Sequence, residues 1–282
     1  MNAILLISCP DKKGIVAQIT NFIYENNGNI EHADQHIDFQ TKTFFMRIEW
    51  CLDDFRIPLQ EIEKSFSFIF EKFNMKYSLY FTDEKPRLAI FVSKKMHCLY
   101  DLLLKYQENQ FKCEIPLIIS NYPFAKKVAK NFKINFYFFP KNEKNREEAE
   151  EKEISLLKKE NIELIVLARY NRIFTKRFVD KFLHRIINIH HSFLPAFVGS
   201  RPYEQAYQRG VKIIGATSHY VVEELDAGPI IEQDVIRVNH RDSLEDLRRK
   251  GEDLEKMVLS RAVRWHIERK ILVYSNKTVI FD

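Results

Sequence analysis

Glycine is scarce in this 282-residue chain, and its distribution is uneven. There are seven glycines, and none lies between Gly28 and Gly199. Four then follow within thirty residues, at positions 199, 210, 215 and 228. Glycine permits tight turns and a close approach of the backbone to a ligand. The late cluster of glycines therefore predicts the rim of an active site over residues 199–228.

Other absences exclude whole classes of protein. No apolar run approaches the ~20 residues that a membrane-spanning helix needs, and Asp11 argues against a signal peptide at the N-terminus. The four cysteines, at positions 9, 51, 98 and 113, have neither CxxC nor another metal-ligand spacing. The chain has no zinc finger, RNP-like motif or sustained basic stripe. We therefore expect a cytoplasmic protein with reduced cysteines that binds no membrane, nucleic acid or metal.

Charge is divided unevenly along the chain. Residues 1–84 hold 8 Lys+Arg against 13 Asp+Glu, whereas the remainder holds 36 against 26. Pro86 follows directly after this change in composition. The shift predicts two domains, residues 1–84 and residues 85–282. The basic second domain suits an anionic ligand.

The first of these domains has the pattern of a small α+β fold. Hydrophobic periodicity predicts strands over residues 3–8, 30–38, 43–51 and 77–81, and helices over residues 11–27 and 59–73. The order βαββαβ is ferredoxin-like. Asp11 is placed to N-cap the first helix, and Gly14 would leave that N-terminus open to a ligand carboxylate. The alternative is that both residues only shape a turn and that the domain only dimerises.

From Pro86 onward, predicted strands alternate with predicted helices. The strands cover residues 87–92, 113–120, 135–139, 164–168, 185–190 and 216–222, and the helices cover residues 99–106, 124–131, 146–159 and 243–268. Two short strands, over residues 271–274 and 278–281, follow the last helix. This alternation predicts an α/β, Rossmann-like domain with a mostly parallel sheet wrapped by helices. Ligands bind such sheets beyond the carboxyl ends of the strands.

The densest group of reactive side chains lies at one such strand end. Asn188 and His190 are two residues apart, so they face the same side of a strand. The Asn188 amide can donate to a developing oxyanion, and the His190 imidazole can carry a proton near neutral pH. Asp226 supplies a carboxylate that can orient a histidine or accept a proton from water. The three suit attack on a small carbonyl group; the alternative is an Asn and a His that merely cap a strand.

Longer motifs surround these residues. NIHHSFLPAFVGSRPY over residues 188–203 is followed by GVKIIGATSHY over residues 210–220 and LDAGP over residues 225–229. Together with the first fifty residues and residues 87–104, these motifs resemble the formyltetrahydrofolate deformylase family of the folate-dependent formyltransferase fold. The resemblance extends over nearly all of the chain. It implies a hydrolase of a linear amide C–N bond that converts 10-formyltetrahydrofolate to tetrahydrofolate and formate without a cofactor or metal, feeding one-carbon and purine metabolism.

The resemblance also assigns residues and partners. CPDKKGIV over residues 9–16 resembles the ACT regulatory domain, which implies a homo-oligomer and an amino-acid effector. LARYNRIF over residues 167–174 matches the strand and loop that hold the pterin in this fold, with Asn171 where methionine is usual. His191 is expected to face away from the site, on the opposite side of the strand from His190. The implied catalytic residues are Asp226, His190 and Asn188, and the implied substrate-binding residues are Leu167, Arg172, Ile173, Phe174, Val222, His219 and His97.

The first turn of the second domain bears on the choice of acceptor. Related transformylases hold a substrate phosphate in a Gly-rich loop here, whereas residues 93–99 contain no glycine. Backbone amides do not easily crowd a phosphate without glycine. The turn therefore favours water as the acceptor. The alternatives are a folate-dependent formyltransferase with an amine acceptor such as glycinamide ribonucleotide, and an inactive amino-acid sensor, against which the presence of all three catalytic residues argues.

Overall fold

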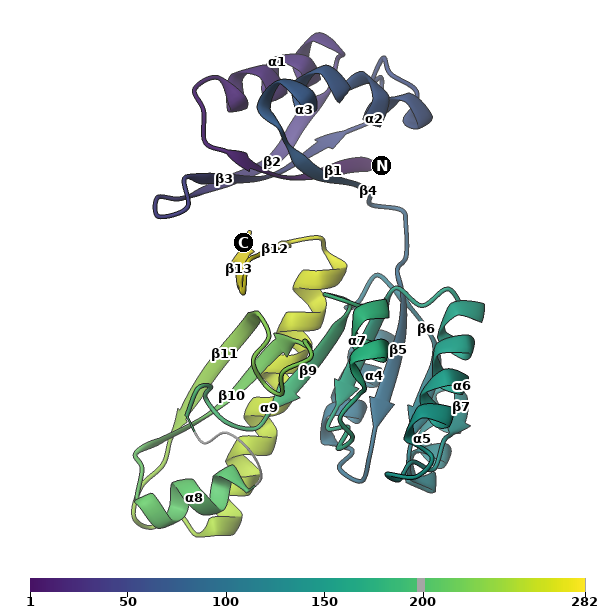
Figure 1. Ribbon diagram of the computed structural model, residues 1–282, viewed down its shortest axis with the longest axis vertical. Coiled ribbons are helices and arrows are strands. Elements are labelled where there is room, and N and C mark those ends of the chain that lie inside the picture. Colours follow the sequence, from purple (N-terminus) through teal and green to yellow (C-terminus); the bar gives the residue numbers. More distant parts are fainter. Residues whose placement is uncertain (197–200, 282) are drawn as a thin grey trace. The chain divides into compact units, whose positions relative to one another are not determined.

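A computed structural model describes residues 1–196 and 201–281, and it divides into two compact units (Figure 1). The first unit contains Met1–Lys85, and the second contains Pro86–Glu268 and Ser275–Thr278. The sequence placed the boundary at residue 84, one residue before this division. It also assigned every later residue to the second domain, whereas Arg269–Tyr274 and residues 279–281 cluster with the first unit. Within the described part of the chain, no helix is long and apolar enough to span a bilayer.

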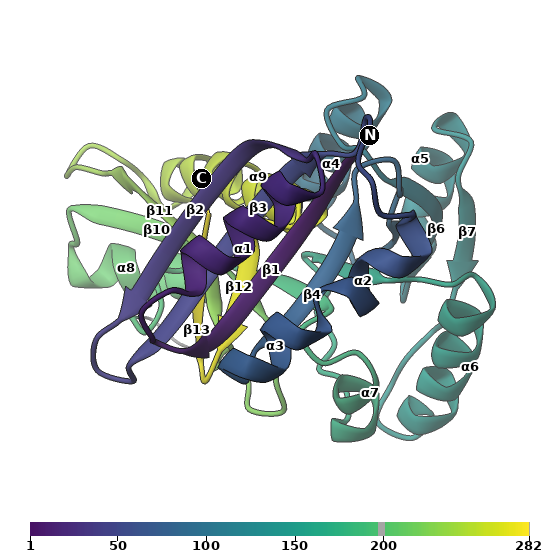
Figure 2. The ribbon, with the colours of Figure 1, turned by 90° about the horizontal axis from the view of Figure 1, so that it is seen from above.

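The first unit is a four-stranded antiparallel sheet with helices on one face (Figures 1 and 2). The strand order is β2-β3-β1-β4, and the connections confirm the predicted α+β ferredoxin-like fold. Ile15, Ile19 and Ile23 of the first helix pack on the sheet with Trp50. In a second hydrophobic cluster, Leu6 and Phe45 pack against residues of the C-terminal strands. The elements are β1 (Asn2–Pro10), α1 (Ile15–Glu25), β2 (Asn29–Asp38), β3 (Thr43–Cys51), η1 (Leu59–Glu61), α2 (Ile62–Ser65), α3 (Ser67–Phe73), β4 (Lys76–Phe81) and β12 (Ile271–Tyr274). The last strand, β13 (Lys277–Ile280), is divided between the two units after Thr278.

Two local predictions for this unit are wrong. Asp11 does not cap α1, because the N-cap residue is Gly14, with φ 92°, and the Asp11 backbone N–H donates to the Lys42 carbonyl at 2.9 Å. Glycine adopts this left-handed φ without a steric cost, so the helix begins later than predicted. The helix predicted over residues 59–73 is divided into η1, α2 and α3. Phe66 lies at the division and packs its ring 4.2 Å from that of Phe22 in the core.

The second unit contains a seven-stranded sheet in the order β11-β10-β9-β8-β5-β6-β7. The pairs β5–β6, β6–β7, β5–β8 and β8–β9 are parallel. The pairs β9–β10 and β10–β11 are antiparallel. The predicted mostly parallel sheet is therefore confirmed. Its strands are β5 (Arg87–Val92), β6 (Glu114–Ser120), β7 (Asn135–Phe138), β8 (Leu164–Ala168), β9 (Ile186–His190), β10 (Ile213–Tyr220) and β11 (Ile230–Arg237).

Helices cover this sheet because each has an apolar stripe to bury. Ile154 and Phe178 pack against Phe91 and Leu167 of the sheet. The last helix contacts β9, β10, β11 and α4, and it begins with a capping box between Ser243 and Asp246. The helices are α4 (His97–Gln107), η2 (Pro123–Ala125), α5 (Lys126–Asn131), α6 (Arg146–Lys159), α7 (Lys176–Lys181), α8 (Pro202–Arg209) and α9 (Leu244–Ile267).

The strand order also positions the site. The four central strands lie in the order β9-β8-β5-β6. The chain continues from β5 to β6 on one side and from β8 to β9 on the other side. The loops that follow β5 and β8 therefore run in opposite directions and leave a crevice beyond the carboxyl ends of these strands. This crevice is where the sequence placed its reactive side chains.

Candidate active site

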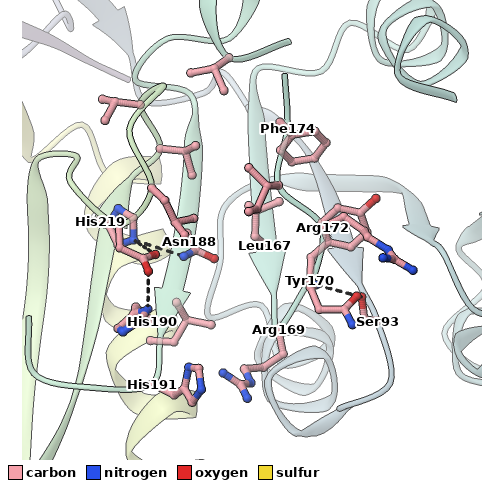
Figure 3. A pocket seen from close by; sticks show the side chains of 18 of the residues that line it. Ser93, Leu167, Arg169, Tyr170, Arg172, Phe174, Asn188, His190, His191 and His219 are labelled. Atoms are coloured by element: carbon pink, nitrogen blue, oxygen red, sulfur yellow. Dashed lines mark hydrogen bonds and ion pairs between the residues drawn. The ribbon is translucent and has the colours of Figure 1, made fainter. Parts of the chain in front are cut away.

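A cavity of about 610 Å³ lies beyond the carboxyl ends of β5, β8 and β9. Its walls come from the turn after β5, from the loop after β8, from the end of β9 and from the loop after β10 (Figure 3). Nine of the ten residues that the sequence assigned to catalysis or substrate binding line it. They are Leu167, Arg172, Ile173, Phe174, Asn188, His190, His219, Val222 and Asp226.

Strand pairing brings Asn188 and His219 together. β10 runs antiparallel to β9, and His219 lies opposite Asn188. Nδ2 of Asn188 is 3.2 Å from Nε2 of His219, and Nδ1 of His219 is 2.9 Å from the Tyr220 carbonyl oxygen. Because a carbonyl only accepts hydrogen bonds, Nδ1 carries a proton, and Nε2 accepts from the amide. His219 thus fixes the orientation of Asn188 and leaves the second amide N–H for a ligand (Figure 3).

His190 and Asp226 form the reactive pair. Nδ1 of His190 is 3.1 Å from Oδ2 of Asp226, and Nε2 of His219 is 3.6 Å from the other carboxylate oxygen. The His190 side chain is 5% exposed, and its Nε2 is buried without a hydrogen-bond partner in the described part of the chain. The carboxylate therefore holds one edge of the ring and leaves Nε2 for a reacting group.

The loop that carries Asp226 approaches β10 closely. Asp226 has φ 56°, a left-handed conformation that few residues other than glycine, Asn and Asp adopt. A Cβ at Gly228 would lie 1.8 Å from the Tyr220 carbonyl oxygen, so only glycine fits there. The glycine predicted to shape an active-site rim therefore does so at position 228.

The charge of Asp226 follows from its surroundings. Burial alone would raise the pKa of this carboxyl, but the interactions with the imidazoles of His190 and His219 outweigh burial and hold the pKa well below its ordinary value. Asp226 is therefore ionised at neutral pH. A fixed negative charge at this position stabilises a positive charge on His190 and can hold a water molecule by its proton.

The wall formed by residues 167–174 includes the apolar side chains of Leu167, Ile173 and Phe174. Ile173 is 57% exposed and offers its side chain to a ligand. Phe174 stacks on Phe178 with ring centroids 4.0 Å apart. Behind this wall, the buried ammonium of Lys141 lies 4.8 Å from the Phe174 ring centroid and 2.8 Å from a carboxylate oxygen of Glu153.

Asn171, the residue that departs from the family pattern, has polar partners. The Ser93 hydroxyl lies 2.6 Å from the side-chain oxygens of both Asn121 and Asn171, and the Asn171 backbone N–H donates to the same hydroxyl at 3.0 Å. A hydroxyl has one proton, so it donates to one of these oxygens at a time. The polar side chain at position 171 is therefore satisfied within the wall of the cavity, where the glycine-free turn after β5 meets it.

Two histidines lie elsewhere than the sequence predicted. The prediction that His191 faces away is wrong: it lines the cavity, with ring centroids 5.3 Å from His190 and 5.8 Å from Tyr203. β9 ends at His190, so the alternation of a strand no longer applies to the next residue. Burial, with a contribution from the charge of Arg169, lowers the pKa of His191 to about 3. His97 is not among the lining residues of the cavity; it begins α4 and lies 2.7 Å from Glu255.

No role was predicted from the sequence for Arg169, Tyr203 or Glu255. Glu255 is fully buried on α9, with Nε2 of His97 at 2.7 Å and Oη of Tyr203 at 2.6 Å within hydrogen-bond distance, and it forms an ion pair with Arg169, 3.3 Å from Nε. Arg169 lines the cavity. One signal could have revealed this network, because Glu255 is the one charged residue among the buried residues described on α9, and a fully buried acid requires partners.

One group of potential metal ligands occurs among residues 1–196 and 201–281. Ligand atoms of His97, Cys98 and Glu255 lie within 4.8 Å of one another. Burial, with the nearby charge of Glu255, raises the pKa of the Cys98 thiol well above its ordinary value, so the thiolate that binds metals is disfavoured. The Arg169 guanidinium already compensates the charge of Glu255. These groups therefore fit a hydrogen-bonded network better than a cation site.

Comparison with known proteins identifies the family. The formyl transferase family matches residues 86–263, and the ACT domain family matches residues 3–67. A formyltetrahydrofolate deformylase from Synechocystis sp. is 53% identical over 281 residues, which cover 100% of this chain and 99% of that protein. The crystal structure of a formyltetrahydrofolate deformylase from Pseudomonas syringae pv. tomato has a TM-score of 0.97 at 44% identity and covers 100% of this chain and 94% of its own.

A glycinamide ribonucleotide transformylase from Symbiobacterium toebii is less similar. Its crystal structure has a TM-score of 0.67 at 28% identity and covers 73% of this chain and 98% of its own. The likeness to the deformylases, in contrast, includes both units of the fold. The chain belongs to the formyltetrahydrofolate deformylase family.

Proposed function

We propose that this protein hydrolyses 10-formyltetrahydrofolate to tetrahydrofolate and formate. The observation that carries the proposal is the arrangement of Asn188, His190 and Asp226 around one cavity, with Nε2 of His190 buried and without a partner among the described residues. Membership of the deformylase family supports the substrate. Leu167, Ile173 and Phe174 offer apolar side chains to the flat pterin ring, and Val222 lines the same cavity.

The reaction needs one water and no redox change. Asp226 holds the water by a hydrogen bond and accepts a proton from it as the new C–O bond forms at the formyl carbon. Asn188 and His190 stabilise the oxyanion that results. The C–N10 bond then breaks, and His190 donates its proton from Nε2 to N10. His190 recovers a proton from the attacking water through Asp226, and formic acid releases its remaining acidic proton to solvent as formate.

Asn188, His190 and Asp226 together supply every group that these steps need. The Asp226 carboxylate stabilises the imidazolium form of His190, which is the form that donates a proton. We therefore infer a reaction without a metal or a bound cofactor. The four unpaired cysteines agree with a reducing, cytoplasmic location.

We infer that the first unit regulates and assembles the enzyme. It matches the ACT domain family, and a Cβ built at Gly14 has open space around it, so the start of α1 is accessible to a small ligand. We propose that it binds an amino acid such as glycine or methionine and that the protein forms a homo-oligomer. Light scattering of the whole chain tests the assembly. Hydrolysis rates with each amino acid added test the effector, and rates that no amino acid changes would contradict it.

The choice between water and an amine acceptor can be tested directly. The protein is incubated with 10-formyltetrahydrofolate, with and without glycinamide ribonucleotide, and tetrahydrofolate and formate are measured. We expect equal amounts of the two products, formed at the same rate in both mixtures. Tetrahydrofolate that appears only with the amine, together with formylated amine, would instead indicate a transferase.

A further inference from the structure

Arg169 is held in an unusual position in the cavity wall. It follows the last residue of β8 and has φ 59°, a left-handed conformation that costs a residue with a Cβ of the order of 1 kcal/mol or more. Its side chain is 20% exposed and borders the cavity, and Figure 3 shows its guanidinium pointing toward the ring of His191. Strain of this kind persists where the surrounding structure demands one particular placement of a side chain.

Groups behind Arg169 determine that placement. The fully buried carboxylate of Glu255 forms an ion pair with Arg169, 3.3 Å from Nε, and accepts a hydrogen bond from Tyr203 at 2.6 Å. A Cβ at Gly251 would lie 2.1 Å from the Tyr203 hydroxyl oxygen, so α9 leaves room for this contact. Nε is thereby directed away from the cavity. The two Nη groups have no ion pair or hydrogen bond with the described residues.

Hydrolysis creates an anion in this cavity, whereas transfer to an amine does not. Formate forms beside Asp226, which is already a carboxylate. Like charges close together in a partly dry site repel each other strongly. A cation in the same cavity offsets this repulsion, and a guanidinium can bind both oxygens of a carboxylate at once.

We propose that Arg169 forms a subsite for formate, the product of the proposed hydrolysis, and so favours water as the acceptor. The inference depends on that proposed function. Arg169 is suited to this role because its neighbour His191 has a pKa of about 3 and is neutral at physiological pH, so the guanidinium does not face a second positive ring. Lys95 borders the same cavity, but its ammonium is paired with Glu252 at 2.8 Å.

The test measures the affinity for formate itself. Inhibition of hydrolysis by sodium formate is compared in the wild type, Arg169→Gln and Lys95→Gln, with sodium chloride and acetate at equal ionic strength as controls. We expect Arg169→Gln to raise the inhibition constant of formate at least ~10-fold, because a charge-assisted bidentate contact is lost. Lys95→Gln removes an equal charge from the cavity rim and is expected to change the constant less than ~2-fold. Equal effects of the two variants would overturn the proposal.

Direct measurement of formate binding tests the formate subsite separately from the proposed hydrolysis. Binding of ¹³C-labelled formate to the whole protein with tetrahydrofolate is followed by NMR and needs no turnover. Normal hydrolysis by the wild type with unchanged formate binding in Arg169→Gln would refute the subsite and leave the function standing. Absent hydrolysis would refute the function, while formate binding lost in the variant would still support the subsite. If Arg169→Gln does not fold, Arg169→Lys replaces it. A single ammonium cannot bind both oxygens of formate as a guanidinium does, so we expect weaker formate binding. Unchanged formate binding would refute the subsite.

Discussion

The buried ammonium of Lys141 allows a quantitative prediction. Lys141 is 5% exposed, and its Nζ lies 2.8 Å from Glu153 and 3.7 Å from Glu150. Glu150 in turn accepts hydrogen bonds from the backbone and the hydroxyl of Thr175, next to the cavity wall. Lys141→Met would leave the buried carboxylate of Glu153 without its cation, whereas Glu150 keeps Arg146 at 3.5 Å. Removing one partner of a buried ion pair costs about 3–5 kcal/mol, so we expect a loss of that order in the free energy of unfolding.

The loss should depend on pH in a defined direction. Burial raises the pKa of Glu153 to about 7, and Lys141 only partly opposes this effect. The pKa of the folded state is thus above the ordinary value, so the contribution of Glu153 to stability is greatest below pH 4.5 and is lost as the pH rises through about 7. Without Lys141 the ionised form becomes still less favourable. The destabilisation by Lys141→Met should therefore be larger at pH 8 than at pH 5.

Urea unfolding at the two pH values, followed by circular dichroism, measures this difference. Lys158→Met, which changes an exposed lysine of α6, is the control and should alter stability by less than ~0.5 kcal/mol. Glu153→Gln should gain stability relative to the wild type as the pH rises from 5 to 8, because it cannot ionise. A loss below ~1 kcal/mol for Lys141→Met at pH 8, or an equal loss at both pH values, would refute the reasoning.

Three further predictions concern the active site. Asp226→Asn and His190→Ala should each lower kcat/KM for hydrolysis at least ~100-fold, and near-normal turnover in either would contradict their assignment. Gly228→Ala should displace the loop that carries Asp226, because its Cβ would lie 1.8 Å from the Tyr220 carbonyl oxygen, and should lower kcat in the same assay; unchanged kcat would show that the loop has room. Hydrolysis should persist after prolonged dialysis against a chelator, and activity that is lost and then restored by zinc would identify metal ligands.

Elements with a strong local pattern could be predicted from the sequence. The apolar run before Asn188 indicates β9, and the structure places that strand at Ile186–His190. The helix predicted over residues 243–268 is α9, because Ser243 caps it and Leu247, Leu254 and Val258 repeat on one face. Each of these signals depends on residues that are close together in the chain.

Features that depend on distant residues could not be predicted in this way. His219 lies opposite Asn188 only because β10 pairs antiparallel with β9 in one register. No local pattern fixes that register. The same holds for Glu255, whose partners His97 and Arg169 are more than eighty residues away along the chain. The position of His191 depended on where β9 ends, and strand ends are the least certain part of a pattern.

The source of the oxygen in the product tests the central claim most directly. The protein is incubated with 10-formyltetrahydrofolate in ¹⁸O-labelled water, and the formate is analysed by mass spectrometry at early times. If Asp226 and His190 direct water to the formyl carbon, each new formate carries one ¹⁸O atom and appears together with one tetrahydrofolate. Unlabelled formate, or tetrahydrofolate formed only when an amine is added, would contradict a hydrolase.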